Sequence, residues 1–295
     1  MKKRLDLYSM DIVRIQYGLI EPDIEFNHIR KFGKIPRQAF LSKDTKYKFA
    51  DIPDTIQFIT LDHYDYTYPV ETPVKWPAEC IVVYIRGYTP LIYHLPDTLI
   101  RLVIEDITHV EYNNLGSPFK LQLPGNLKSL EFYDTIIPDL NITIQNMQNN
   151  DKIKMEYLGI HYNKVRPGID DTNSIVITIN RILDIFVSNL ELIELKYLII
   201  KIDEAFNSDG STDGIESIFD YSGIDTSRLP DSLETLKIVI PRYYPLYLTY
   251  TLPSNLKKLI IYDWIHYYYT KLRFLFWIKV WKTLEIELYT NGTWL

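Results

Sequence analysis

The chain has 295 residues, of which 46 % are hydrophobic and 24 % are charged, and its net charge is −6. This composition is typical of a globular protein with a full core, and the negative charge argues against non-specific binding to nucleic acid. The single cysteine, Cys80, excludes an intrachain disulfide and a cysteine-based zinc site. Since no run of about 18 uncharged apolar residues and no signal-peptide core occurs, we predict a cytoplasmic protein without a membrane span.

Residues 1–50 precede the first clear repeat, and we expect them to form an N-terminal cap with a degenerate first repeat. From residue 51 onward the chain repeats one pattern, in which an apolar residue is followed three and five positions later by two more. Nine copies begin at residues 56, 80, 99, 127, 155, 195, 233, 256 and 281. Most of the intervals lie near the roughly 20–29 residues typical of leucine-rich repeats, so the sequence predicts one array over residues 51–288.

A turn signal precedes most copies of the pattern. Five copies follow an apolar residue, a proline and two small or polar residues, as in "LPDSLETLKI" at 229–238, and "WPAEC" at 76–80 is a weaker sixth. Proline cannot donate to a strand ladder, so it is expected in the turn, with a short strand after it. One unit cannot bury its apolar face alone, whereas stacked units can.

These features predict a repeat solenoid of the leucine-rich-repeat type, with one continuous parallel β-sheet and irregular or short helical connections on the other face. Two long intervals indicate insertions, at 165–194 and 203–226. The first contains a stretch, 172–194, with the length and apolar spacing of a helix, and the second reads as an exposed loop rich in Gly, Ser and Asp. The aromatic C-terminal segment, 264–295, is expected to cap the last unit.

The repeated Leu-Pro-x-x-Leu-x-x-Leu pattern resembles the FNIP repeat, a relative of the leucine-rich repeat found in slime moulds and giant viruses. Phe26-Asn27 precedes Ile35-Pro36, and Tyr112-Asn113 precedes Leu123-Pro124, over a resemblance that covers about residues 25–288. It implies a leucine-rich-repeat-like fold and a viral or slime-mould protein. Two family features are missing: Tyr64, Ile107 and Thr135 replace the buried asparagine ladder, and residues 1–24 are too short for the F-box adaptor of viral members.

The residues between the inward positions of each strand are expected to face solvent and to form an extended binding surface. Aromatic and arginine side chains favour protein interfaces. The candidate partner-binding residues are Phe58, Tyr84, Arg86, Arg101, Glu105, Tyr133, Tyr157, Tyr197, Lys237, Lys257 and Tyr262. Val103, Glu131 and His161 are expected at solvent-facing positions of the same surface.

The sequence contains no motif of a catalytic or metal site. None of the six histidines has metal-ligand spacing, and nucleophile-elbow and phosphate-binding glycine motifs are missing. We therefore expect a non-enzymatic scaffold without a cofactor, which binds another protein through the exposed face of the sheet. The alternative is a structural virion or assembly component that is contacted through its caps and insertions.

Overall fold

The structure is a computed structural model that describes residues 37–42, 49–64, 74–107, 119–144, 153–162, 177–184, 193–202, 229–240, 252–263, 285–290 and 293–294. Its strands are β1 (Gln38–Ser42), β2 (Phe58–Asp62), β3 (Val82–Arg86), β4 (Arg101–Glu105), β5 (Lys120–Leu123), β6 (Ser129–Tyr133), β7 (Asn141–Ile144), β8 (Ile153–Tyr162), β9 (Ile193–Ile202), β10 (Thr235–Ile240), β11 (Lys258–Asp263), β12 (Glu285–Thr290) and β13 (Thr293–Trp294). Two 3-10 helices, η1 (Phe49–Asp51) and η2 (Pro90–Tyr93), and an α-helix over 177–184 complete the described elements.

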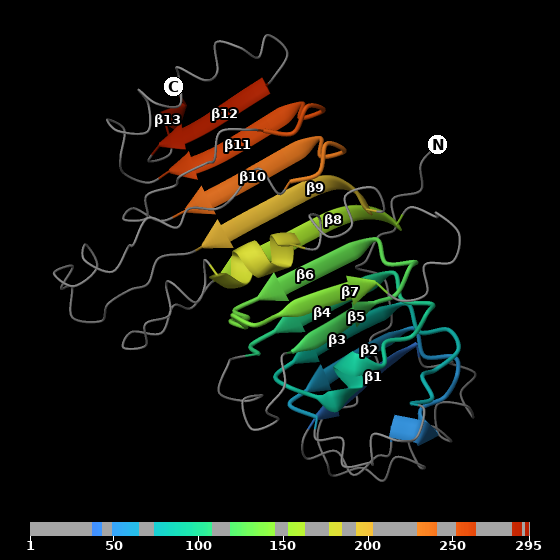
Figure 1. Cartoon of the computed structure of the whole chain (residues 1–295). Coiled ribbons are helices and arrows are strands. Elements are labelled where there is room, and N and C mark those ends of the chain that lie inside the picture. The colour runs from blue at the N-terminus through green and yellow to red at the C-terminus, as the bar shows by residue number, and fades with distance from the viewer. Residues whose placement is uncertain are drawn as a thin grey trace, which may run out of the picture.

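Eleven of these strands form one sheet whose spatial order is also their order along the chain, with β5 and β7 left out (Figure 1). The neighbours run parallel from β1 to β12, and only β12 and β13 are antiparallel. The expectation of one long parallel sheet is therefore confirmed. The first strand, β1, lies within residues 1–50, where we expected a cap and a degenerate first repeat.

The register of the sheet places the apolar residues of successive units in two continuous inward rows. The first row is Ile59, Val83, Leu102, Leu130, Leu158, Leu198, Leu236 and Leu259, and the second is Leu61, Ile85, Ile104, Phe132, Ile160, Ile200 and Ile238. All of these side chains are buried. Each such aliphatic side chain stabilises the fold by about 1.5–3 kcal/mol, and it does so against the units on either side.

The ninth copy of the pattern is shifted by two residues from its predicted position. Ile286, not Leu284, pairs with Leu259, and Leu288 pairs with Ile261. The segment "LEIEL" has an apolar residue at every second position, so alternation alone does not fix its register.

Six strands, β2, β3, β4, β6, β10 and β11, are preceded by the turn that the proline predicts. The carbonyl of Pro96 accepts a hydrogen bond from the N–H of Leu99 at 3.1 Å, and the same bond follows Pro53, Pro77, Pro124, Pro230 and Pro253. The next two amides, of Ile100 and Arg101, both donate to the carbonyl of Ile81 in the preceding unit, at 2.9 and 3.1 Å. The turn therefore aligns each strand with its neighbour before the ladder begins.

A second corner follows the strands of the N-terminal half. His63, Gly87, Asp106 and Asp134 come directly after β2, β3, β4 and β6, and all have positive φ, between 47° and 72°. The N–H of each donates a hydrogen bond to the carbonyl of the last or next-to-last residue of the following strand in the sheet. The N–H of Gly87, for example, donates to the carbonyl of Glu105 at 2.8 Å. Asp and His are enriched among the residues that adopt this left-handed conformation, so the corner suits them.

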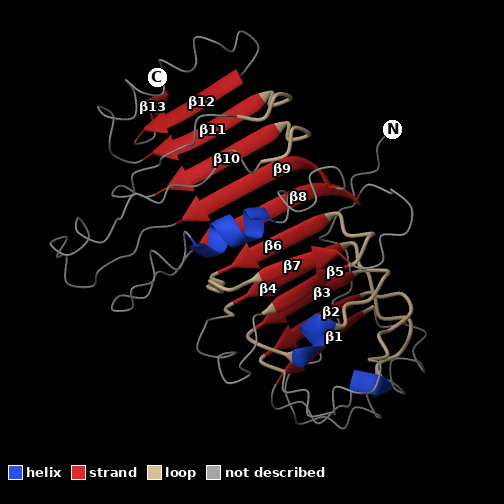
Figure 2. Cartoon of the chain, in the orientation of Figure 1, coloured by secondary structure: helices blue, strands red, loops and turns tan. Residues whose placement is uncertain are grey.

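The connections form a second layer on one side of the sheet (Figure 2). It contains η2, the two parallel strands β5 and β7, and the helix 177–184, whose apolar side chains belong to the same core as the inward rows. The hydroxyl of Thr178 in this helix accepts a hydrogen bond from the N–H of Ile137 at 3.0 Å. Short helical and irregular connections were expected on this side of the sheet.

The helix expected within 172–194 covers 177–184 in the described part of that stretch, and β9 already begins at Ile193. The insertion predicted at 203–226 and most of the aromatic segment, 264–284, lie outside the described residues. Tyr64, Ile107 and Thr135, which stand where an asparagine ladder would be, are buried. No described helix is long and apolar enough to cross a membrane.

Candidate functional site

The outward face of the sheet is lined by residues that alternate with the inward rows. Of the predicted binding residues, Phe58, Tyr84, Arg86, Arg101, Glu105, Tyr133, Tyr157, Tyr197 and Lys237 occupy outward positions, and Tyr262 occupies the matching position on β11 next to Val239. The described side chains among them are partly or largely exposed. The sheet thus brings residues from most of the array onto one face.

An ion pair on β4 and β6 lies at the middle of this face. Nε and Nη2 of Arg101 lie 2.9 and 2.8 Å from Oε1 of Glu131. The other carboxylate oxygen, Oε2, accepts a hydrogen bond from the hydroxyl of Tyr133 at 2.8 Å, and Ser129 donates to Oε1 at 3.3 Å. The Glu131 side chain is only 6 % exposed, whereas that of Arg101 is 44 % exposed. A buried carboxylate therefore holds a partly exposed guanidinium.

Two aromatic stacks continue this cluster across the neighbouring strands. The rings of Tyr133 and His161 lie 4.5 Å apart with an interplanar angle of 9°, and those of Tyr157 and Tyr197 lie 5.6 Å apart with an angle of 12°. Both stacks join register partners on adjacent strands. Gly159 lies between Tyr157 and His161 on β8, and a Cβ there would be 2.8 Å from His161 Nε2 and 3.0 Å from the Tyr157 ring. Glycine thus gives room for both rings.

Burial changes the acidity of the tyrosines in this cluster. Burial and the neighbouring Glu131 and Tyr197 charges raise the pKa of Tyr157 to about 12. Burial also raises the pKa of Tyr133 well above its ordinary value, and its hydrogen bond to Glu131 acts in the same direction. Both phenols therefore stay protonated at neutral pH, and the hydroxyl of Tyr133 donates a hydrogen bond to Glu131.

The structure corrects the expectation that Val103, Glu131 and His161 face solvent. All three are buried, although they occupy outward positions. Arg101 and Tyr133 contact Glu131, and the ring of Tyr133 stacks on His161, which alternation along a single strand does not reveal. Glu131 and His161 therefore belong to the candidate site, and their register next to Tyr133 and Arg101 is the signal that could have identified them.

Lys257 also differs from its predicted position. It precedes β11 and lies at the turn edge, where its Nζ is 2.9 Å from a carboxylate oxygen of Glu234. The residues at the same position of neighbouring units alternate in charge, with Lys128 3.9 Å from Glu156. The hydrogen bond from Lys257 lowers the pKa of Glu234. The step from turn to strand inserts one residue into the alternation, so that Lys258 rather than Lys257 faces outward.

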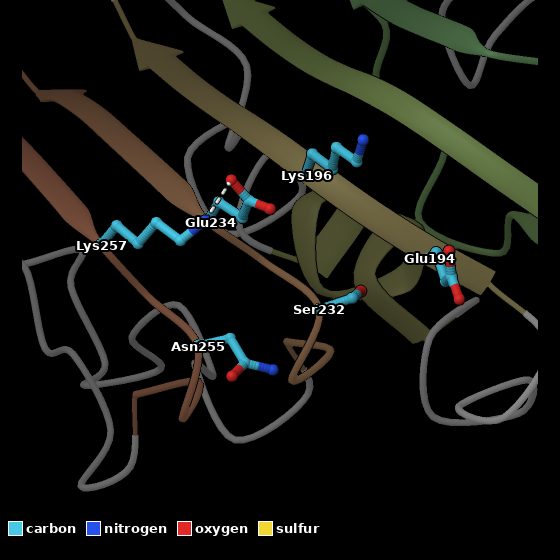
Figure 3. A pocket seen from close by; sticks show the side chains of 6 residues that line it. All are labelled: Glu194, Lys196, Ser232, Glu234, Asn255 and Lys257. Atoms are coloured by element: carbon cyan, nitrogen blue, oxygen red, sulfur yellow. Dashed lines mark ion pairs between the residues drawn. The ribbon is translucent and has the colours of Figure 1, made fainter.

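A hollow of about 320 Å³ lies where β9, β10 and β11 begin (Figure 3). Its lining residues are Glu194, Lys196, Ser232, Glu234, Asn255 and Lys257. The hydroxyl of Ser232 accepts a hydrogen bond from the Leu195 N–H at 2.9 Å and donates to the Leu195 carbonyl at 3.1 Å. Because these contacts and the Lys257–Glu234 pair join neighbouring units, we interpret the hollow as a junction between repeats rather than as a ligand site.

Two further side-chain groups bear on chemistry. Arg86 and Asp62 form a loose ion pair on the N-terminal half of the face, with 3.9 Å between Nε and Oδ1. Cys80 belongs to the buried core, and this burial raises the pKa of its thiol to about 12, which disfavours the reactive thiolate. Within the described residues, no three His, Cys, Asp or Glu side chains are grouped as metal ligands.

Comparison of the chain with family models, with curated proteins and with solved structures gives no match. The class of fold and the candidate site therefore depend on the sequence pattern and the geometry described above.

Proposed function

We propose that the chain is a leucine-rich-repeat-like solenoid that acts as a non-enzymatic scaffold and binds another protein through the outward face of its sheet. Three features support the solenoid: the strand order follows the chain, the same proline turn recurs, and the connections lie on the opposite side of the sheet. In such arrays the outward residues of the sheet form one continuous surface and are not needed to pack the core.

One observation carries the functional proposal, namely the ordered cluster of Arg101, Glu131, Tyr133, Tyr157 and Tyr197. Tyrosine and arginine dominate the energetics of protein interfaces, especially where their conformations are already fixed. Here the rings are stacked on their register partners and the guanidinium is paired with a buried carboxylate. A partner would therefore bind these side chains with little loss of conformational entropy.

Chemical cross-linking on a native complex tests the proposal without any substitution. The intact chain is immobilised, incubated with native lysate and treated with a lysine-reactive cross-linker, and the linked residues are identified by mass spectrometry. We expect cross-links at Lys201, Lys237 and Lys258, which occupy outward positions. The matched control lysines are Lys75, Lys120 and Lys128, which are exposed away from that face.

Cross-links confined to the control lysines, or to the segment 264–284, would contradict binding through the sheet face. That outcome would favour the structural assembly component that is contacted through caps and insertions.

A further inference from the structure

The side chains around Arg101 on the outward face indicate which chemical group a partner would present. We propose that Arg101 binds a carboxylate of the partner protein, on an aspartate or glutamate flanked by apolar residues. This inference rests on the proposed function, because it names the kind of protein segment that the same face would bind.

The guanidinium of Arg101 has one edge occupied and one edge available. Its Nε and Nη2 both contact Oε1 of Glu131, which is a side-on arrangement. A guanidinium carries five N–H groups, so the end formed by Nη1 and the second N–H of Nη2 is left for another acceptor. Two parallel N–H groups at that end match the two oxygens of a carboxylate, and the side chain is 44 % exposed.

The cluster fixes the orientation of this donor pair before a partner arrives. Glu131 accepts hydrogen bonds from Tyr133 and Ser129 as well as from Arg101. It is buried, so its position is set by these bonds and by the strand beneath it. A guanidinium held in this way loses little side-chain freedom on binding, which is the main benefit of pre-organised sites.

The surroundings of Arg101 are apolar on one side and aromatic on the other. Val82 is its register partner on β3, and Tyr84 lies two residues further along that strand. Tyr133 and Tyr157 lie on the following strands. Apolar residues beside the partner's carboxylate would pack on these side chains and exclude water, which strengthens the charged hydrogen bonds.

The charge of the face as a whole is mixed, so the donor pair of Arg101, rather than a net positive charge, would select a carboxylate. At the outward positions beside the two inward rows, β1 to β11 carry five basic residues (Arg86, Arg101, Lys201, Lys237 and Lys258) and three acidic ones (Asp62, Glu105 and Glu131), and β12 adds Glu285 and Glu287. Nucleic acid fits less well, because the tyrosine rings stack on one another across the strands and a face of mixed charge is no polyanion footprint.

The test uses selection of short random peptides, displayed on phage, against the immobilised full-length chain. We expect the enriched peptides to share an Asp or Glu next to an aromatic or aliphatic residue. One enriched peptide, synthesised with a fluorescent label, should bind Arg101→Gln and Arg101→Lys about tenfold more weakly than the unchanged protein. Lys120→Gln, on the exposed side of β5, is the matched control and should bind normally.

A second binding experiment uses a peptide in which the acidic residue is changed to its amide. Affinity should fall about tenfold for the unchanged protein and hardly at all for Arg101→Gln, since the two changes remove the same contact. Circular dichroism of each variant separates loss of binding from loss of folding.

Three results would overturn the inference. Peptides without a carboxylate that still need Tyr157, as judged by Tyr157→Ala, would leave the face as the binding surface and remove the acidic partner. A labelled oligothymidine that competes with the peptide would replace the protein ligand by a polyanion. No enriched peptide, or peptides indifferent to both Arg101 and Tyr157, would count against the proposed function itself.

Discussion

The imidazole of His63 lies over Gly87, in the space that a Cβ on residue 87 would occupy. The two residues hold the same corner position in successive units, and both have positive φ, 47° at His63 and 72° at Gly87. Asp106 and Asp134 occupy that corner in the next units, so a side chain is compatible with the backbone there. At position 87 glycine is required because the histidine of the preceding unit packs on it.

Gly87→Ala should therefore lower the free energy of unfolding by about 1–3 kcal/mol, through backbone strain and the clash with His63. Urea unfolding measures the loss. His63→Ala alone should change stability by less than about 0.5 kcal/mol, since this side chain is exposed. In the double variant part of the loss should be recovered, and an equal loss with and without His63 would mean that only the backbone matters.

The Arg101–Glu131 pair gives a second prediction, of non-additivity. Arg101→Ala should cost about 3 kcal/mol, because it leaves the buried carboxylate of Glu131 without its cation. Glu131→Ala should cost about 1–3 kcal/mol, since Tyr133 and Arg101 lose their acceptor. The double variant should be more stable than Arg101→Ala alone in chemical denaturation. A loss equal to the sum of the two would contradict the coupling seen in the structure.

The raised pKa of Tyr157 predicts a loss of stability in alkali. An unfolded tyrosine ionises near pH 10, whereas Tyr157 in the folded chain keeps its proton to about pH 12. Between these values the folded state binds more protons, so its contribution to stability is complete below about pH 10 and is lost as the pH rises toward 12. Tyr157→Phe should therefore flatten the fall of the denaturation midpoint over this range, whereas an unchanged slope would refute the assignment.

Adjacent residues on β10 test the two faces of the sheet. Leu236 is buried in the first inward row, while Lys237 is outward and only partly covered. Leu236→Asp should prevent folding, because it buries a charge without a partner. Lys237→Ala should stay within about 0.5 kcal/mol of the unchanged protein. Circular dichroism melting compares the two, and similar effects would show that the inward and outward assignment is wrong.

Much of the sheet could be predicted because its information is local and repeated. The spacing of three apolar residues defines one strand, and the proline before it defines one turn, so each copy supports the others. The prediction failed at the ninth unit, because "LEIEL" has an apolar residue at every second position and so does not fix the register. Ile286 takes the place expected for Leu284. The second-layer strands β5 and β7 carry no repeated phrase and were not predicted.

The candidate site was harder to predict, because its contacts cross from strand to strand. Arg101 and Glu131 are 30 residues apart, and Tyr133 and Tyr157 belong to different units. Alternation identified most outward positions, yet burial of Glu131 and His161 depends on neighbours in adjacent units. Gly159, which makes room for two rings, has no signature in the sequence of its own unit.

The shared carbonyls at the turns have a consequence for how such a chain can grow. Ile81 accepts two amides from the unit that follows it, and Ile100 does the same for the next unit. Gln57, Lys128 and Glu234 accept the same pair of amides in other units, so a gene duplication that copies one such unit would insert it into the array without leaving unmatched edges. The binding face could then lengthen by one strand at a time, and each added strand would bring its own outward residues for selection to alter independently of the rest.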